Sequence, residues 1–155
     1  MTYTIELRQE TGQPKLSIRG KVTFAEIGEK VGEFVAETSA YLERLGIEPD
    51  GPPFTRVHGL SPDHIDLEAG LTIRRPIQGE ARIESGVLPD GPVAFTLHRG
   101  DYQTLPEANE AILNWANANG WQANGPNWER HMVAPGHDPN PENWRTEVVM
   151  PLKKA

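Results

Sequence analysis

The chain of 155 residues contains no cysteine. This absence excludes disulfide bonds, iron–sulfur clusters, thiolate zinc sites and cysteine nucleophiles, and it agrees with the cytoplasmic location that we expect. The sequence also lacks any apolar run near the roughly 20 residues that a membrane span needs. Its opening residues show no basic segment followed by an apolar core, so we expect neither a signal peptide nor membrane association.

Basic residues are scarce as well. The 15 Lys and Arg against 22 Asp and Glu give a net charge of −7, and because phosphate contact needs clustered cations, we do not expect direct nucleic-acid binding. No pair of histidines has zinc-ligand spacing together with a third ligand. A Gly-x-Ser-x-Gly elbow, a phosphate-cradling glycine loop and a dinucleotide fingerprint are absent too. We therefore expect no metal and no cofactor.

What the sequence does contain is an internal repeat. Three pairs of segments match in the same order along the two halves: Ile18–Gly20 with His98–Gly100, Gly46–Phe54 with Gly120–Trp128, and Asp66–Leu71 with Arg145–Met150. The length suits one domain over residues 1–155. We predict two repeats inside it, the first over about residues 3–75 and the second over about residues 80–152.

Each half shows the pattern of a strand, a helix and two further strands. Apolar residues recur every three or four positions from Ile27 to Leu45, and Gly46 then ends the helix. Pro106 suits the first turn of the second helix, which Gly120 ends. The expected strands cover residues 15–19, 54–58, 66–73, 93–98, 128–133 and 145–152. These elements predict an α+β fold built from two βαββ units.

Three segments carry a resemblance to a known family: Leu97–Tyr102, Gly125–Glu129 and Trp144–Val148. As a set they resemble the GyrI-like effector-binding domain, over about Ile5 to Leu152. The resemblance implies a pseudo-two-fold axis, an antiparallel curved sheet with the helices on one side, and a groove between the halves that binds small aromatic or cationic molecules. Many members carry a preceding DNA-binding domain; here the domain begins near Met1, so we do not expect direct control of transcription.

Glu147 is the first candidate site residue. It lies in an apolar strand, where alternation puts Glu147 and Val149 on one face, and a buried carboxylate is costly unless a partner pairs with it. In the family, a glutamate of the matching strand meets cationic ligands. The alternative is a surface carboxylate, or an ion pair with Arg145 or Arg130. Its counterpart in the first repeat, Glu68, we expect to be structural.

Aromatic residues supply the other candidates, because flat or cationic ligands stack on aromatic faces. All four tryptophans fall between Trp115 and Trp144. The predicted ligand-binding residues beside Glu147 are Trp115, Trp128, Trp144, Tyr102, Phe54, Tyr41 and His131. For each of them a core or structural role is the alternative, and Trp121 is expected to be a packing residue only.

Two functions from different classes remain open. The first is a binding module that senses or sequesters a hydrophobic or aromatic, in some cases cationic, xenobiotic. The second, implied by stand-alone relatives, is a hydrolase that opens cyclopropane-bearing genotoxic compounds, with Glu147 as general base and Tyr102 or His131 as proton partner. A third interpretation is a scaffold that binds a regulator or another protein, or that forms a homodimer.

Overall fold

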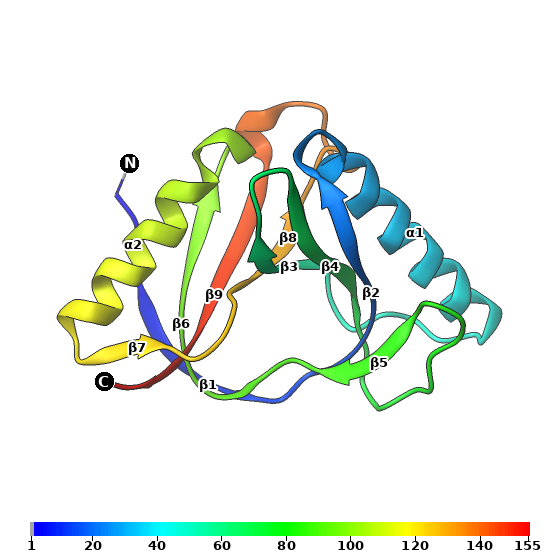
Figure 1. Cartoon of the computed structure of the whole chain (residues 1–155), viewed down its shortest axis with the longest axis horizontal. Helices are drawn as coiled ribbons and strands as arrows, with labels where there is room; N and C mark the ends of the chain where they lie inside the picture. Colours follow the sequence, from blue (N-terminus) through cyan, green and yellow to red (C-terminus); the bar gives the residue numbers. More distant parts are fainter. Residues whose placement is uncertain (1) are drawn as a thin grey trace. The chain divides into compact units, whose positions relative to one another are not determined.

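A computed structural model, shown in Figure 1, describes residues 2–155. The chain consists of antiparallel strands and two α-helices, so the predicted α+β class is confirmed. It divides into two compact units. One covers residues 12–88 and is called the 12–88 unit below. The other combines residues 2–11 with residues 89–155 and is called the 89–155 unit.

In the 12–88 unit, four strands form an antiparallel sheet in the order β3-β4-β2-β5. The elements are β2 (Pro14–Thr23), the 3-10 turn η1 (Phe24–Glu26), α1 (Ile27–Arg44), β3 (Phe54–Leu60), β4 (His64–Thr72) and β5 (Glu84–Val87). The helix α1 lies against β2 and β4 (Figure 1). Its apolar stripe, including Phe34 and Leu42, packs on Leu16, Ile18 and Leu67. Burial of this stripe is what makes the segment a stable helix.

In the 89–155 unit, the main sheet has the order β1-β6-β9-β8, and β7 pairs with the end of β9. The elements are β1 (Glu6–Thr11), β6 (Asp90–Arg99), η2 (Tyr102–Thr104), α2 (Leu105–Ala118), β7 (Trp121–Ala123), β8 (Trp128–Val133), η3 (Pro141–Asn143) and β9 (Arg145–Lys154). The helix α2 packs through Ala108, Ile112 and Ala116 on Val148 and Met150. This unit holds most of the predicted site residues, including Glu147 on β9, His131 on β8 and Tyr102 in η2.

The two units share one strand register. Phe54 pairs with Gly70, and Trp128 pairs with Val149 in the same way. A bulge follows in each, between Val57 and Gly59 and between His131 and Val133. Within this register Glu68 occupies the position of Glu147. The symmetry that would relate the two units in space remains a prediction.

The sequence match of Ile18–Gly20 with His98–Gly100 is wrong by two residues. Ile18 pairs with Ala69, whereas in the other unit it is Thr96 that pairs with the matching Val148. Ile18 therefore corresponds to Thr96, and not to His98 as the sequence match predicts. The reason is that β2 runs three residues past Gly20 before its helix turn, while β6 ends just before Gly100.

Three strands escape the sequence pattern: β1, β5 and β7. The β1 segment is mostly polar, with Leu7 as its one apolar side chain, and β7 has only three residues. These segments become strands because they pair with β6, β2 and β9, and not because of their own sequence pattern. β1 pairs with β6 of the later half, although the predicted boundaries assign residues 3–11 to the first repeat.

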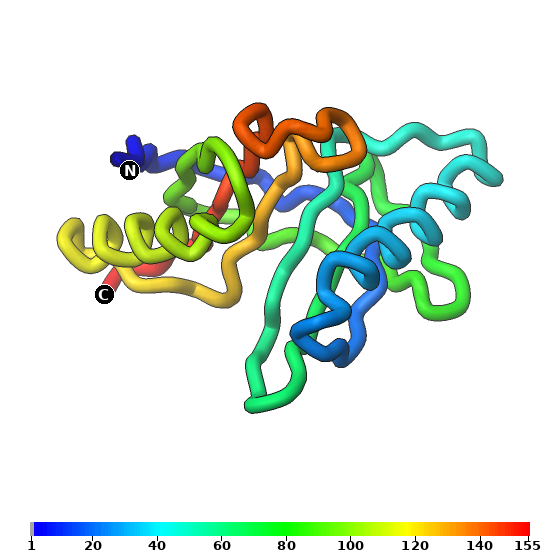
Figure 2. Tube along the Cα trace, turned by 90° about the horizontal axis from the view of Figure 1, so that it is seen from above, coloured from blue at the N-terminus to red at the C-terminus, as the bar shows by residue number. Residues whose placement is uncertain are grey.

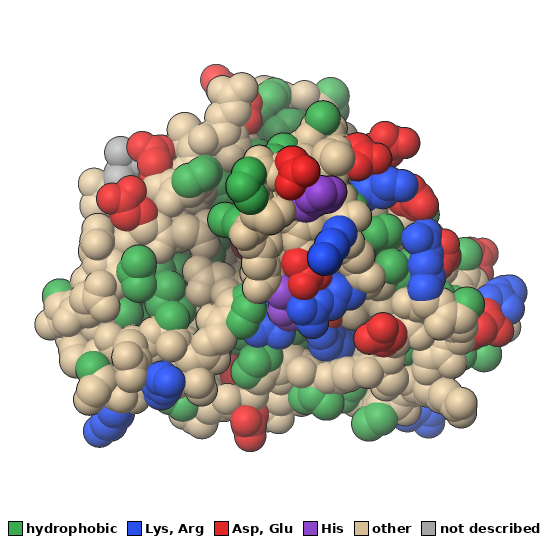
Figure 3. All heavy atoms as spheres, in the orientation of Figure 1, with side chains coloured by type: hydrophobic (Ala, Val, Ile, Leu, Met, Phe, Trp, Pro, Cys, Tyr) green, Lys and Arg blue, Asp and Glu red, His purple; other side chains and the backbone are tan. Residues whose placement is uncertain are grey.

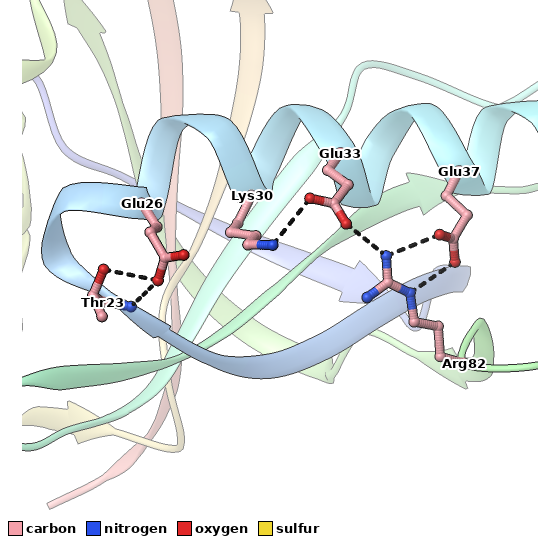
Figure 4. Close-up of polar contacts among 6 residues, drawn as sticks. All are labelled: Thr23, Glu26, Lys30, Glu33, Glu37 and Arg82. Carbon is pink, nitrogen blue, oxygen red and sulfur yellow. Dashed lines mark hydrogen bonds and ion pairs between the residues drawn. The ribbon is translucent and has the colours of Figure 1, made fainter.

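The connector after β4 is held against α1 by an arginine. Arg82 donates to both oxygens of Glu37 at 2.9 Å and to Glu33 at 3.0 Å (Figure 4). A second contact comes from Tyr41, whose hydroxyl donates to the carbonyl of Gln78 at 2.8 Å. These bonds fix a segment that has no regular secondary structure of its own.

Substitution of Gly70 tests how closely β4 approaches β2 in the 12–88 sheet. A Cβ at Gly70 would lie 2.2 Å from the carbonyl oxygen of Leu16 and 2.6 Å from Cα of Ser17. We expect Gly70→Ala to lower the free energy of unfolding by about 2–4 kcal/mol, because the backbone must move to relieve the clash. Urea denaturation followed by circular dichroism measures this. Gly59→Ala is the matched control in the same hairpin, since no atom lies within 4 Å of its Cβ; equal losses in both variants would contradict the close approach.

Candidate functional site

Strand alternation divides the side chains of the 89–155 sheet between two faces. Val148 and Met150 pack toward α2, so Thr146, Val148 and Met150 define the helix face. Glu147 and Val149 lie on the opposite face. Residues that pair directly across antiparallel strands point to the same side. His131 pairs with Thr146 and therefore lies on the helix face, whereas Arg130 pairs with Glu147 on the opposite face.

Glu147 is part of an ion-pair network on the opposite face. Its Oε1 accepts hydrogen bonds from Arg8 at 2.9 Å and from Arg130 at 2.7 Å, and Arg8 also pairs with Glu10. The pair with Arg130, an alternative left open by the sequence, is confirmed. The pair with Arg145 is wrong, because that guanidinium donates to the carbonyls of Glu142 and Trp144. Two arginines thus offset the cost of removing this carboxylate from water.

Several predicted aromatic residues have core positions. Trp128 and Phe54 are almost fully buried, and so is the ring of Tyr41. Trp115 is half-buried and packs on the α2 core cluster. Trp121 packs there too, as expected for a structural residue. Burial of this degree is typical of core side chains, so their contribution to ligand binding remains a prediction.

The helix face brings together three residues of the predicted set. The ring of Tyr102 lies edge-on to the imidazole of His131, with centroids 5.7 Å apart. The ring of Tyr102 also contacts Trp144, with centroids 5.1 Å apart. Tyr102 comes from η2 and His131 from β8, whereas Trp144 lies between η3 and β9. Three segments distant in sequence therefore build one aromatic cluster.

Glu129 joins this cluster and was missed by sequence reasoning. It pairs with Val148 in the β8–β9 register and so lies on the helix face. Burial raises the pKa of Tyr102, and the charge of Glu129 raises it further. The signal that could have found Glu129 is its place two residues before His131 in the same strand. The set Tyr102, Glu129, His131 and Trp144 is called the Tyr102 cluster below.

Two loops position the rings of the Tyr102 cluster. Before Tyr102, Gly100 adopts a φ of 108°, which favours glycine, and its amide donates to the carbonyl of Trp144 at 3.0 Å. The loop of residues 134–144, orange in Figure 2, folds around Asp138. The indole nitrogen of Trp144 donates to the Asp138 carbonyl at 2.8 Å. These bonds orient the indole and leave its face against Tyr102.

The protonation states suit a cationic partner. Burial lowers the pKa of His131 to about 4, so this imidazole is neutral at pH 7. The phenol of Tyr102, whose pKa is raised by burial, is neutral as well. Glu129 then supplies a negative charge beside aromatic faces, the combination that attracts flat or cationic groups.

The 12–88 unit carries the counterpart of Glu147 in a different setting. Glu68 is 2% exposed and accepts hydrogen bonds from Lys15 and Ser17 on one oxygen, while His58 contacts the other at 2.7 Å. Burial alone would raise its pKa, but the bonds from Lys15, Ser17 and His58 lower the pKa overall. Figure 3 shows cationic and histidine side chains gathered with carboxylates over β2, β3 and β4. These contacts agree with the structural role expected for Glu68.

Each unit has a shallow hollow on its surface. The hollow of the 89–155 unit has a volume of about 360 Å³ and is lined by Thr2, Thr4, Glu6, Phe95, Thr96, Leu97 and Arg99. The hollow of the 12–88 unit, about 260 Å³, is lined by Lys21, Gly59, Leu60, Ser61, His64, Ile65 and Asp66. Neither hollow is lined by a predicted site residue. Leu97, in the hollow of the 89–155 unit, does pair with Glu147 across the strands.

Within residues 2–155, no three His, Asp or Glu side chains are grouped so that they could hold a metal ion. The helices of the same part of the chain are too short or too polar to cross a membrane.

The sequence matches the model of the GyrI-like small molecule binding domain over residues 3–153. The structure is similar to the C-terminal domain of EcmrR, with 20% identity, a TM-score of 0.82 and full coverage of both chains. In the EcmrR–DNA complex the identity is 19% and the TM-score 0.84; the match covers 99% of this chain but only 58% of that one. No curated protein sequence matches the chain.

Two further solved structures share the fold. A hydrolase from Listeria innocua is 13% identical, with a TM-score of 0.66 and coverage of 96% of this chain and 91% of that one. SAV2435 bound to tetraphenylphosphonium is 14% identical, with a TM-score of 0.59 and coverage of 99% and 94%. At these identities the likeness shows the fold alone.

The buried imidazole of His131 makes stability depend on pH. The unfolded chain takes up a proton at this histidine near pH 6.5, whereas the folded chain does so only near pH 4. The free energy of unfolding therefore carries no penalty from His131 above pH 6.5, and it falls by about 2–3 kcal/mol as the pH is lowered to 4. Urea denaturation of the protein and of His131→Phe across this range measures the difference.

His137→Gln, at an exposed histidine of the same unit, is the control for this experiment. The unmodified protein and His131→Phe could also lose the same stability between pH 6.5 and 4. That result would show that His131 is not held neutral by burial.

Proposed function

The chain belongs to the GyrI-like small molecule binding family, as its sequence resemblance predicts, and on this premise we propose that the Tyr102 cluster binds an aromatic, cationic compound. Binding at this site serves to sense or sequester a xenobiotic. The observation that carries the proposal is the presence of a carboxylate, Glu129, beside the adjacent rings of Tyr102 and Trp144. Neutral His131 adds a polar group without adding a repelling charge.

The chemistry of the cluster favours a delocalised cation over a small metal ion or a neutral sugar. An aromatic face attracts a cation through its quadrupole, and the attraction grows where water is partly excluded. A bulky cation covered by aromatic rings also leaves water at little cost compared with an ammonium group. Tetraphenylphosphonium, the molecule bound to SAV2435, has these properties and is therefore the probe of choice for this chain.

Glu147 is the rival carboxylate for such a ligand. A cation at Glu147 would have to displace or repel Arg8 and Arg130, which both donate to the same oxygen. Like charges in one network raise the cost of that step. Glu129, on the helix face beside Tyr102, thus replaces Glu147 as the residue proposed to meet the cation.

Binding of tetraphenylphosphonium, followed by calorimetry, tests the proposal. We expect Glu129→Gln to weaken binding about tenfold or more, because the amide keeps the shape but removes the charge that attracts the cation. Trp144→Ala should weaken it by a similar factor through loss of stacking. Glu110→Gln, at an exposed carboxylate of α2, should bind like the unmodified protein.

Glu147→Gln separates the two carboxylates. We expect it to lower the free energy of unfolding while leaving the affinity within about twofold. If instead Glu147→Gln abolished binding and Glu129→Gln did not, the ligand would lie on the opposite face of the sheet and the Tyr102 cluster would not be the site.

Hydrolysis of a cyclopropane-bearing compound is the second candidate function. It is favoured by the contact between the imidazole of His131 and the phenol of Tyr102, two groups through which a proton can pass. Mass spectrometry of the compound after incubation would detect a ring-opened product. Turnover that survives in both His131→Phe and Glu129→Gln would exclude the Tyr102 cluster from this chemistry.

A further inference from the structure

A buried histidine, His98, connects the N-terminal segment to the turn that carries Tyr102. His98 is fully buried on the helix face of β6. Its Nε2 lies 2.8 Å from the carbonyl oxygen of Asp101. A carbonyl only accepts, so Nε2 carries the proton, and in a neutral imidazole Nδ1 is then the acceptor. The hydroxyl of Tyr3, 2.9 Å from Nδ1, is therefore the donor of that bond.

The segment before β1 is held by few contacts. Residues 2–5 form no helix or strand. The ring of Tyr3 stacks on His98, with centroids 6.0 Å apart, and the hydroxyl of Thr96 donates to the carbonyl of Thr4 at 2.8 Å. Tyr3 and Ile5 also pack on the α2 core cluster. Tyr3 and Thr96 thus provide the polar contacts through which this segment is fixed to β6.

The turn on the other side of His98 is equally short. It comprises Asp101 and η2, and its bonds run from the amide of Gln103 to the Asp101 carboxylate at 2.9 Å and from Thr104 to the Asp101 carbonyl at 3.1 Å. The same Asp101 carbonyl accepts from His98. Tyr102 is the next residue along the chain, so any shift of this carbonyl moves the phenol of the Tyr102 cluster.

We propose that Tyr3 is a positioning residue for the ligand site, and that docking of residues 2–5 onto β6 fixes the orientation of Tyr102 through His98 and the Asp101 carbonyl. The inference rests on the proposed function, because it concerns the site at Tyr102. The relation is reciprocal: a ligand that stabilises Tyr102 in this orientation stabilises the docked N-terminal segment by the same free energy. Ligand binding is thereby transmitted to the residues that precede β1.

The coupling is tested first without ligand, by NMR of Tyr3→Phe. Removal of the hydroxyl leaves Nδ1 of His98 without its donor, so the ring nitrogen signals of His98 should change and the ring signals of Tyr102, which lie over Trp144, should shift. Thr96→Val, which frees the Thr4 carbonyl, should shift the Tyr102 signals in the same direction. Thr38→Val is the control, since it removes a buried hydroxyl bond to Phe34 in the 12–88 unit.

Unchanged Tyr102 signals in Tyr3→Phe, with altered His98 signals, would overturn the inference, because the histidine would then respond without moving the turn. Tyr102 signals that shift equally in Thr38→Val would also overturn it, since the effect would report a general loss of stability.

The affinity for tetraphenylphosphonium is the second readout. Tyr3→Phe and Thr96→Val should each weaken binding about three- to tenfold, as expected for loss of one positioning hydrogen bond, and Thr38→Val should not. If Glu129→Gln weakens binding and Tyr3→Phe does not, the proposed site stands and the role of Tyr3 is refuted. If no variant of the Tyr102 cluster weakens binding, the proposed function fails, and the NMR shifts alone decide the coupling.

Discussion

The two-residue alternation of β9 is the constraint on which the rest of the 89–155 unit depends. This strand pairs with β6 and β8 over most of its length, so each of its side chains must belong to one face or the other. Val148 and Met150 take the face covered by α2. Glu147 is thereby committed to the opposite face with Arg8 and Arg130, and the helix face is left to the Tyr102 cluster.

Carboxylates in this chain are distinguished by their partners. Glu147 and Glu68 occupy the same position in the register of their units, and each is bound by cations from neighbouring strands. Such pairing offsets the cost of burial but leaves little attraction for a further cation. Glu129 lies on the helix face, where its charge acts on the phenol of Tyr102. It is the carboxylate proposed to meet a ligand because it lies beside aromatic rings, which attract cations.

Sequence reasoning predicted the strongly patterned elements and missed the weakly patterned ones. Both helices, six of the strands (β2, β3, β4, β6, β8 and β9) and the family follow from apolar periodicity, helix-ending glycines and three short segments. The strand β1 could not be predicted, because its polar side chains gain their structure from pairing with β6. The placement of Tyr102, His131 and Trp144 in one cluster also depends on contacts between distant segments. Glu129 was overlooked because its two neighbours in β8, Trp128 and Arg130, attract attention but point to the opposite face of the sheet. The pairing of β8 with β9 is needed to show that Glu129 shares the helix face with His131.

The central claim is that an aromatic cation binds on the helix face of the 89–155 sheet. Intermolecular nuclear Overhauser effects between tetraphenylphosphonium and the protein test it most directly, because they report which side chains lie within about 5 Å of the ligand. The account predicts contacts from the phenyl protons to the rings of Tyr102 and Trp144. Contacts to Phe95 and Leu97 instead, beside Glu147 in the hollow of the opposite face, would contradict it.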